Sequence, residues 1–145
     1  MPEKKTIERA KSAKRRGKAP TTQAGEFVRE EIEHVREGKH GARNAKQVIA
    51  IGLSKARRAG VDLPPPKKGA TSKRTRAQAK RDLAKGKTKE PVSPRRSRVS
   101  AAALEKENRS AASPRALSRQ AKSTAKRRRA AGKSTPGRKS RSRAA

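Results

Sequence analysis

The stretch GEFVREEIEHVREGKHGARNAKQVIAIGLSKARRAGVDLPPP, residues 25–66, carries most of the large apolar side chains of this 145-residue chain. Its first third repeats apolar residues at the spacing of one helix face. The repeating residues are Phe27, Val28, Ile32 and Val35. Thr21 or Thr22 is placed to cap this helix, and Gly38 is placed to end it. The pattern predicts an amphipathic helix with a charged outer face.

A second helix is expected after the short loop that follows. Asn44 is a good N-cap residue, and Gln47 three positions later resembles a capping box. The apolar stripe of this helix comprises Ala45, Val48, Ile49, Gly52, Leu53 and Ala56. Gly60 followed by Val61 is typical of a Schellman stop, and three prolines at 64–66 forbid continuation. The two helices predict a helical hairpin over residues 21–66. Its core is small, so we expect it to need a homodimer or a bound nucleic acid.

Composition sets both flanks apart from this hairpin. The chain has 43 Lys and Arg against 12 Asp and Glu, a net charge of +31, and only 16 Leu, Ile, Val and Phe. Chains so poor in large apolar residues do not offset the entropy of ordering. We therefore expect a disordered basic arm over residues 1–20 and a basic low-complexity tail over residues 67–145 with transient helices. The predicted fold class is mostly α and disordered.

Several classes of function find no support in the sequence. The chain has no Cys, and His34 and His40 lack the paired spacing and companion ligands of a metal site. No catalytic constellation or phosphate loop is present, so we expect no enzyme, no cofactor and no small-molecule substrate. The absence of an apolar leader core or a membrane-length apolar run predicts a cytoplasmic protein without a membrane partner.

The charge excess instead predicts a polyanionic partner, because each cation placed on a phosphate releases condensed counterions. Any single basic run is usually a solvated face, but here the excess persists through both flanks. Phosphate contacts carry no base information. The candidate nucleic-acid-binding residues are Lys14, Arg15, Arg16, Lys39, Arg43, Lys46, Lys55, Arg57, Arg58, Lys73, Arg74, Arg76, Arg95, Arg96, Arg115, Lys126, Arg127, Arg128, Arg129, Arg138 and Lys139.

Two finer interpretations stay open. The second helix has the charge of a recognition helix in a helix-turn-helix, although ordinary hairpin packing explains it as well. Three tail motifs resemble the SPKK-type repeats of linker-histone tails, whose turns project guanidinium groups into narrow A·T-rich grooves. They are Ser93-Pro94-Arg95-Arg96, Ser113-Pro114-Arg115 and Thr135-Pro136-Gly137-Arg138. A disordered segment rich in these residues also produces such triplets by chance. Ser113 with Pro114 is also expected to cap and begin a helix.

Residues 26–66, and most clearly GKHGARNAKQVIAIGLSKARRAG at 38–60, resemble a small bacterial domain family of unknown function. Members are sometimes labelled plasmid stabilisation or DNA-binding proteins. The resemblance implies a role in DNA maintenance and brings no catalytic residues. In composition alone, the tail is similar to linker-histone C-terminal regions and histone-like bacterial proteins.

The leading hypothesis is a sequence-nonspecific DNA-binding protein, nucleoid-associated or serving plasmid maintenance, that neutralises phosphates and condenses DNA. One alternative is an RNA- or ribosome-associated basic protein. Another is an interaction protein whose acidic hairpin face binds a second protein while the tail tethers it to nucleic acid. The single aromatic residue, Phe27, argues against a base-stacking platform.

Overall fold

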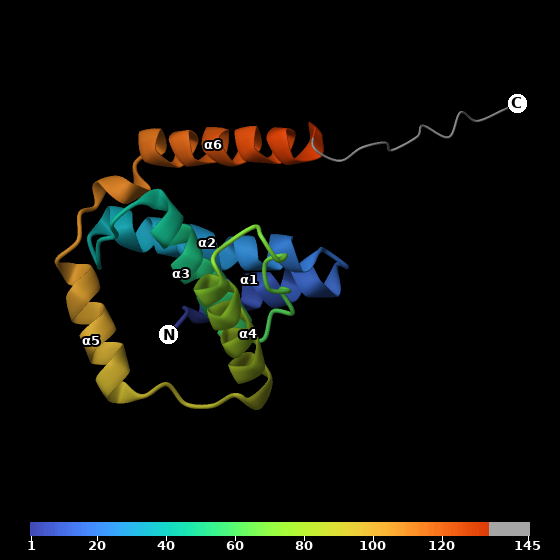
Figure 1. The fold of residues 1–145 in the computed structure, drawn as a ribbon. Helices are drawn as coiled ribbons and strands as arrows, with labels where there is room; N and C mark the ends of the chain where they lie inside the picture. Colours follow the sequence, from blue (N-terminus) through green and yellow to red (C-terminus); the bar gives the residue numbers. More distant parts are fainter. Residues whose placement is uncertain (134–145) are drawn as a thin grey trace, which may run out of the picture.

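Residues 1–133 are described by this computed structural model, and they fold into six α-helices and one short 3-10 helix (Figure 1). The elements are α1 (Lys4–Arg15), α2 (Pro20–Glu37), α3 (Ala45–Arg58), α4 (Lys73–Thr88), α5 (Pro94–Glu105), η1 (Ser110–Ala112) and α6 (Pro114–Lys133). The expected fold class, a hairpin between disordered arms, is wrong, because elements of both flanks pack onto the hairpin.

The hairpin itself is present as α2 and α3, and its predicted ends hold with one exception. Asn44 caps α3, its Oδ1 accepting the Gln47 N–H at 2.9 Å. Gly38 and Gly60 end the two helices at φ of 80° and 94°, a conformation that glycine adopts without strain. The exception is the start of α2. The helix begins at Pro20, because proline suits a first helical turn, and so neither predicted threonine caps it.

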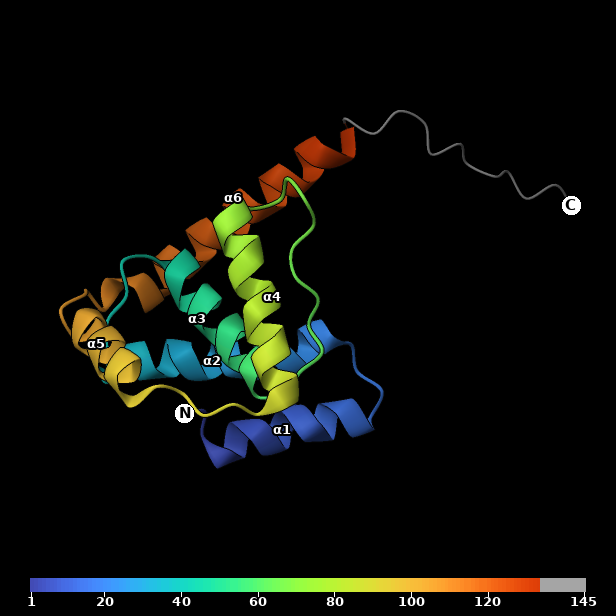
Figure 2. The ribbon, with the colours of Figure 1, turned by 60° about the horizontal axis from the view of Figure 1, so that its bottom comes forward.

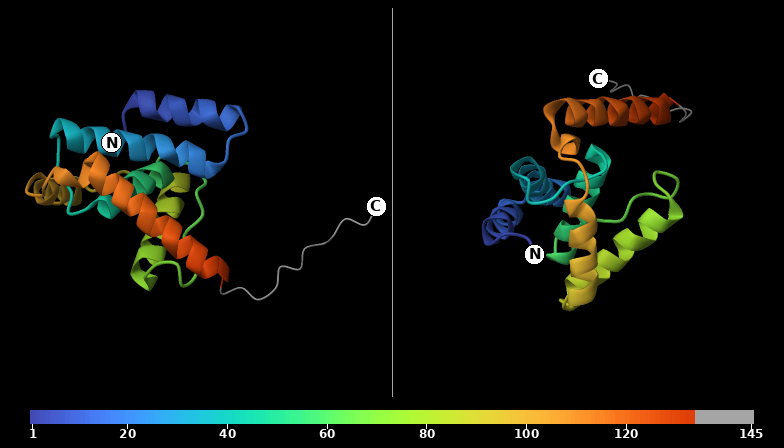
Figure 3. Two further views of the ribbon diagram at one scale, coloured as in Figure 1. Left: turned by 90° about the horizontal axis from the view of Figure 1, so that it is seen from above. Right: turned by 90° about the vertical axis from the view of Figure 1, so that its left-hand side faces the viewer.

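The N-terminal arm forms a helix that packs against α2. Figures 2 and 3 show α1 running beside α2 in the opposite direction. The buried face of α1 is made of Thr6, Ala10 and Ala13, and Ala10 joins Phe27 in one core cluster. Small side chains let two helices approach closely, and a count of large apolar residues does not detect them. The prediction of a disordered arm failed for that reason.

Close backbone approach also joins α3 to its neighbours on two sides. A Cβ atom added to Gly52 would lie 2.6 Å from the Cα of Val28 on α2. A Cβ atom on Gly86 of α4 would lie 2.0 Å from the carbonyl oxygen of Arg57. Both glycines are buried, so these helices cross where only glycine fits. The first part of the predicted disordered tail is therefore a packed helix.

Residues 104–112 return to the hairpin loop. The Gly41 N–H donates to the Leu104 carbonyl at 2.9 Å, and the Ala42 N–H donates to the Asn108 carbonyl at 3.0 Å. Arg36 Nε donates to the Ala112 carbonyl at 2.9 Å. These bonds position α6, which then packs against η1 and α3. In contrast, α5 has no buried residue and lies at the edge of the molecule (Figure 1).

Alanine dominates the core. Among the described residues, nine of the fourteen buried hydrophobic side chains are alanines. The remaining five are Phe27, Val35, Val48, Val61 and Leu63. The expectation of a homodimer rested on the small core of an isolated hairpin, and α1, α4 and η1 supply additional burial within one chain. None of the described helices combines the length and the apolar character that crossing a membrane requires.

Gly86→Ala should lower the free energy of unfolding by about 1–3 kcal/mol, because the added methyl meets the backbone of α3. Urea unfolding followed by circular dichroism measures the change. Gly25→Ala is the matched control, since a Cβ at this position in α2 meets nothing within 4 Å. It should stabilise by about 0.5–1 kcal/mol through helix propensity. Equal effects of the two substitutions would contradict the packing of α4 on α3.

Candidate nucleic-acid interface

A row of exposed cations runs along α6. It comprises Arg115, Arg119, Lys122, Lys126 and Arg129, all of them exposed. Their steps of three and four residues place them on one helix face, in a row about 21 Å long. The half-buried Leu117, Gln120 and Thr124 occupy the other side of the helix. The row therefore faces away from the body of the molecule.

The second half of α6 is cationic around its circumference. Residues 125–132 are all exposed, and Arg127 and Arg128 lie off the row on other sides of the helix. The sequence contains no Asp or Glu after Glu107. Among the described residues, no ion pair joins these cations to a carboxylate that would offset their field.

The tail helices begin at Ser-Pro or Ser-Lys steps. Ser113 Oγ accepts the Ala116 N–H at 3.2 Å, which confirms the predicted cap of α6. Ser93 precedes Pro94 at the start of α5, and Ser72 Oγ caps α4 by accepting the Thr75 N–H at 3.1 Å. Both described Ser-Pro motifs therefore start helices. The third motif, at 135–138, and the candidates Arg138 and Lys139 lie outside the described residues.

Cations occupy the first turns of these helices, where the helix dipole is already positive. The exposed residues are Lys73 and Arg74 in α4, Arg95 and Arg96 in α5, and Arg115 in α6. No acidic residue lies in the first turn of α4, α5 or α6. Each such cation costs about 0.3–1 kcal/mol, and a bound anion relieves this cost while using free backbone N–H groups.

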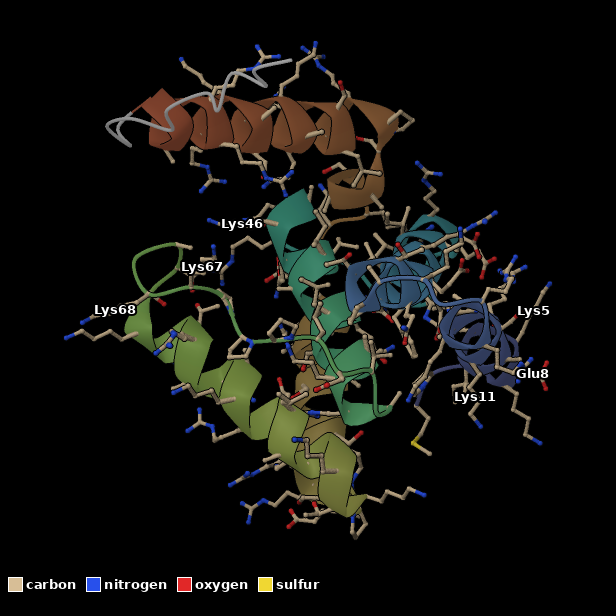
Figure 4. The ribbon with its side chains drawn as sticks, turned by 90° about the vertical axis from the view of Figure 1, so that its right-hand side faces the viewer. Lys5, Glu8, Lys11, Lys46, Lys67 and Lys68 are labelled. Carbon is tan, nitrogen blue, oxygen red and sulfur yellow. The ribbon has the colours of Figure 1, made fainter. Side chains whose placement is uncertain are left out.

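Further exposed cations lie on two sides of the body. Figure 4 shows Lys46 and Lys67 directed to the side between α6 and the start of α4, with Lys68 nearby. Lys5 and Lys11 project from α1 on the other side of the molecule (Figure 4). The predicted candidates Lys14, Arg15 and Arg16 are exposed at the end of α1, and Arg43 is exposed in the loop before α3.

Four other predicted candidates have partners inside the fold. Arg57 is 7% exposed, and its guanidinium donates to the carbonyls of Leu63 and Pro64 at 3.2 and 3.3 Å. Burial lowers the pKa of Arg57, and the nearby Asp82 opposes this effect. Arg58 Nε donates to Asp82 Oδ1 at 2.8 Å.

The remaining two are Arg76 and Lys55. Arg76 Nε donates to the Pro66 carbonyl at 3.0 Å. Lys55 Nζ donates to Glu31, whose side chain has no exposed surface.

Lys39 is exposed but bonded to two carboxylates. Its Nζ lies 3.1 Å from Glu37 Oε2 and 3.3 Å from Glu3 Oε1. The hydrogen bond to Glu37, followed by that to Glu3, raises the pKa of Lys39. The hydrogen bonds from His34 and then Lys39 lower the pKa of Glu3. Lys39 is therefore partly neutralised by its neighbours.

Arg119 and Lys122, which complete the α6 row, were not among the candidates predicted from the sequence. Their signal was the three- and four-residue spacing between Arg115 and Lys126, visible once the segment is taken as a helix. Composition likewise does not separate exposed cations from those bonded inside the fold. Comparison with protein families, curated proteins and solved structures finds no match to this chain. The family resemblance of residues 38–60 stays a prediction.

Arg58→Gln should lower the free energy of unfolding by about 1–3 kcal/mol, because it leaves the buried Asp82 carboxylate without its charged partner. Urea unfolding measures this loss. The affinity of the folded variant for duplex DNA should fall only slightly, by the amount expected when one solvent-screened positive charge is removed. A large loss of DNA affinity with unchanged stability would place Arg58 in the interface instead.

Proposed function

We propose that this protein binds DNA without sequence specificity, with the α6 row as its principal phosphate-binding surface. The observation that carries the proposal is this row of exposed cations on a helix without a single carboxylate. Phosphate neutralisation releases counterions and supplies sequence-independent affinity. A nucleoid location and a role in condensing chromosomal or plasmid DNA belong to the same proposal.

The form of α6 favours duplex DNA over duplex RNA. An α-helix with its side chains is about 10–12 Å in diameter, close to the roughly 12 Å width of the DNA major groove. The major groove of A-form RNA is too narrow for side chains to read. The second half of α6 is exposed on all sides, so it can lie in or along a groove without disturbing the body. Small residues such as Ala130 permit close approach.

Cations on opposite sides of the molecule support a role in condensation. Figure 2 shows α1 and α6 on opposite sides of the helical body. The exposed Lys4, Lys5, Lys11 and Lys14 on α1 offer a second surface for phosphates. A molecule with two such surfaces bridges two duplexes, and bridging draws DNA segments together. We therefore assign tight binding to α6 and bridging to α1.

Replacing Arg119, Lys122, Lys126 and Arg129 with Gln should weaken duplex binding and flatten its salt dependence. Each lost phosphate contact removes about 0.9 from the slope of log affinity against log salt, so roughly 3–4 in all. Gel-shift titrations across a salt series measure the slope. Structured RNA of equal length serves as a competitor, and preferential binding of RNA would reject the choice of DNA.

The matched control removes the same charge from α1, by replacing Lys4, Lys5, Lys11 and Lys14 with Gln. This variant should keep most of the single-duplex salt slope and lose the capture of a second duplex, measured by pull-down of a labelled duplex on an immobilised one. If both variants lose the same slope, only net charge matters, and α6 is not a distinct interface.

A further inference from the structure

Glu31, His34 and His40 meet beside the N-terminal segment, where α2, the loop after it and α3 come together. His40 Nε2 lies 3.1 Å from Glu31 Oε2, and His34 Nδ1 lies 3.6 Å from Glu31 Oε1. The candidate ligand atoms of the three residues all lie within 4.8 Å of one another. The Glu31 side chain is fully buried, and the two imidazoles are 12% and 15% exposed. The cluster is therefore shielded from solvent.

Both ring nitrogens of each histidine lie near an oxygen atom, and those of His40 are both within hydrogen-bond distance of one. His40 Nδ1 lies 2.9 Å from the Gly41 carbonyl oxygen, while its Nε2 faces Glu31. His34 Nε2 lies 3.0 Å from Glu3 Oε1, while its Nδ1 also faces Glu31. A neutral imidazole has one N–H, and here both nitrogens of each ring face oxygen acceptors. One neutral ring cannot donate to both neighbours of His40, and a cation bound at Nε2 satisfies the contact that the single N–H leaves open. His34 Nδ1, at 3.6 Å from Glu31 Oε1, makes no hydrogen bond to this carboxylate and is free to coordinate.

The outer contacts match those of metal-binding histidines. Such residues donate the N–H that does not face the metal to a carboxylate or a backbone carbonyl, which fixes the tautomer. His34 has Glu3 in this position, and His40 has the Gly41 carbonyl. In both rings the remaining nitrogen is the one that faces Glu31. The two histidines therefore present opposite nitrogens, Nδ1 and Nε2, to the same carboxylate.

A separate observation points to missing positive charge. Glu30 is 4% exposed, and its buried Oε2 has no hydrogen-bond partner among the described residues. The other oxygen of this carboxylate lies 3.8 Å from His34 Nε2. Glu3, Glu30 and Glu31 thus surround His34. Lys55 and Lys39 are the cations that contact these carboxylates, and Lys39 is shared with Glu37.

We propose that Glu31, His34 and His40 bind a Zn²⁺ ion through the Glu31 carboxylate, His34 Nδ1 and His40 Nε2. Tetrahedral Zn²⁺ with ligands at about 2.0–2.1 Å holds neighbouring ligand atoms roughly 3.3–3.5 Å apart. His40 Nε2 lies 3.1 Å from Glu31 Oε2, and His34 Nδ1 lies 3.6 Å from the other oxygen, Oε1. The candidate ligand atoms of the three residues all lie within 4.8 Å of one another, so small side-chain movements bring them to one ion. Two imidazoles exclude Ca²⁺ and Mg²⁺, which prefer oxygen ligands. Lys55 remains on Glu31 Oε1 as an outer partner, and water completes the coordination.

Neither histidine is predicted as a metal ligand from the sequence, because the two lack the paired spacing and companion ligands of a metal site. The third ligand is a carboxylate one helical turn before His34, which earlier counted only as part of a charged face. His40 reaches the cluster through the loop, and Gly38 turns the chain there at φ 80°. Only the folded loop brings the three residues together.

The test uses the full-length protein without an affinity tag, since its sequence contains only two histidines. Addition of Zn²⁺ alone should saturate at one equivalent and raise the melting temperature. A long-range ¹H–¹⁵N spectrum should then show His34 as the Nε2–H tautomer and His40 as the Nδ1–H tautomer. Co²⁺ should give the absorption of a tetrahedral site, and Mg²⁺ should have no effect.

His34→Gln and His40→Gln should each weaken Zn²⁺ binding at least tenfold, whereas Glu33→Gln, an exposed carboxylate on the same helix, should leave it unchanged. Unaltered histidine signals in the presence of Zn²⁺, or full binding by both histidine variants, would overturn the proposal. Two rings that stay doubly protonated at neutral pH and ignore Zn²⁺ would do the same. If the variants fail to fold, the histidine tautomers of the wild-type protein in the presence of Zn²⁺ test the proposal without them.

Discussion

Two buried carboxylates, Glu31 and Asp82, determine how a chain of net charge +31 brings its helices together. A buried charge without a partner costs several kcal/mol, so each carboxylate fixes the cations around it. Asp82 on α4 accepts from Arg58 Nε at 2.8 Å and from Ser54 Oγ at 2.7 Å, which sets α4 against α3. Glu31 on α2 accepts from Lys55 on α3. The register of three helices follows from these two side chains.

The same arrangement divides the cations into two groups. Those near Glu31 and Asp82 are bonded within the fold, and Arg57 reaches backbone carbonyls instead. Among the described residues, no ion pair joins the cations of α6 to a carboxylate, because the row is exposed and faces away from the body. Their field is left to solvent and counterions, which a polyanion displaces. The distribution of twelve acidic residues along the chain thus determines where the protein is able to bind phosphate.

The hairpin was predictable because its helix ends depend on residues next to one another in sequence. Asn44 caps the helix that follows it, and Gly38 and Gly60 end the helices that precede them. The rest depends on partners distant in sequence. In the sequence, Ala10 and Ala13 look like part of a low-complexity basic segment. Their burial depends on α2, which packs against this face of α1. Likewise, a glycine such as Gly86 normally weakens a helix and becomes necessary only at a crossing. Counting large apolar residues therefore underestimated a core built from alanine.

The sequence predicted the class of partner, a polyanion, but not which cations are exposed to it. Charge alone indicates a polyanion, yet it does not show that Arg57 and Arg58 are bonded inside the fold while Lys46, on the same helix, is exposed. The three- and four-residue spacing of the α6 cations is visible in the sequence, but it predicts a row on one face only if the segment is a helix. Its capping Ser113 was recognised, whereas the bonds that hold 104–112 on the hairpin were not, because backbone hydrogen bonds leave no trace in side-chain identity.

The loop at 38–44 links the proposed zinc site to the placement of α6. His40 reaches the cluster from this loop, and the next residues, Gly41 and Ala42, donate their backbone N–H groups to the segment that leads into α6. A side chain at Gly41 has no space, since its Cβ would lie 1.9 Å from the Glu107 carbonyl oxygen. One loop conformation therefore serves both contacts. An ion bound as proposed would hold His40 against Glu31 and would also stabilise the backbone on which the base of α6 rests. Occupancy of the cluster and the orientation of the cationic row would then be thermodynamically coupled.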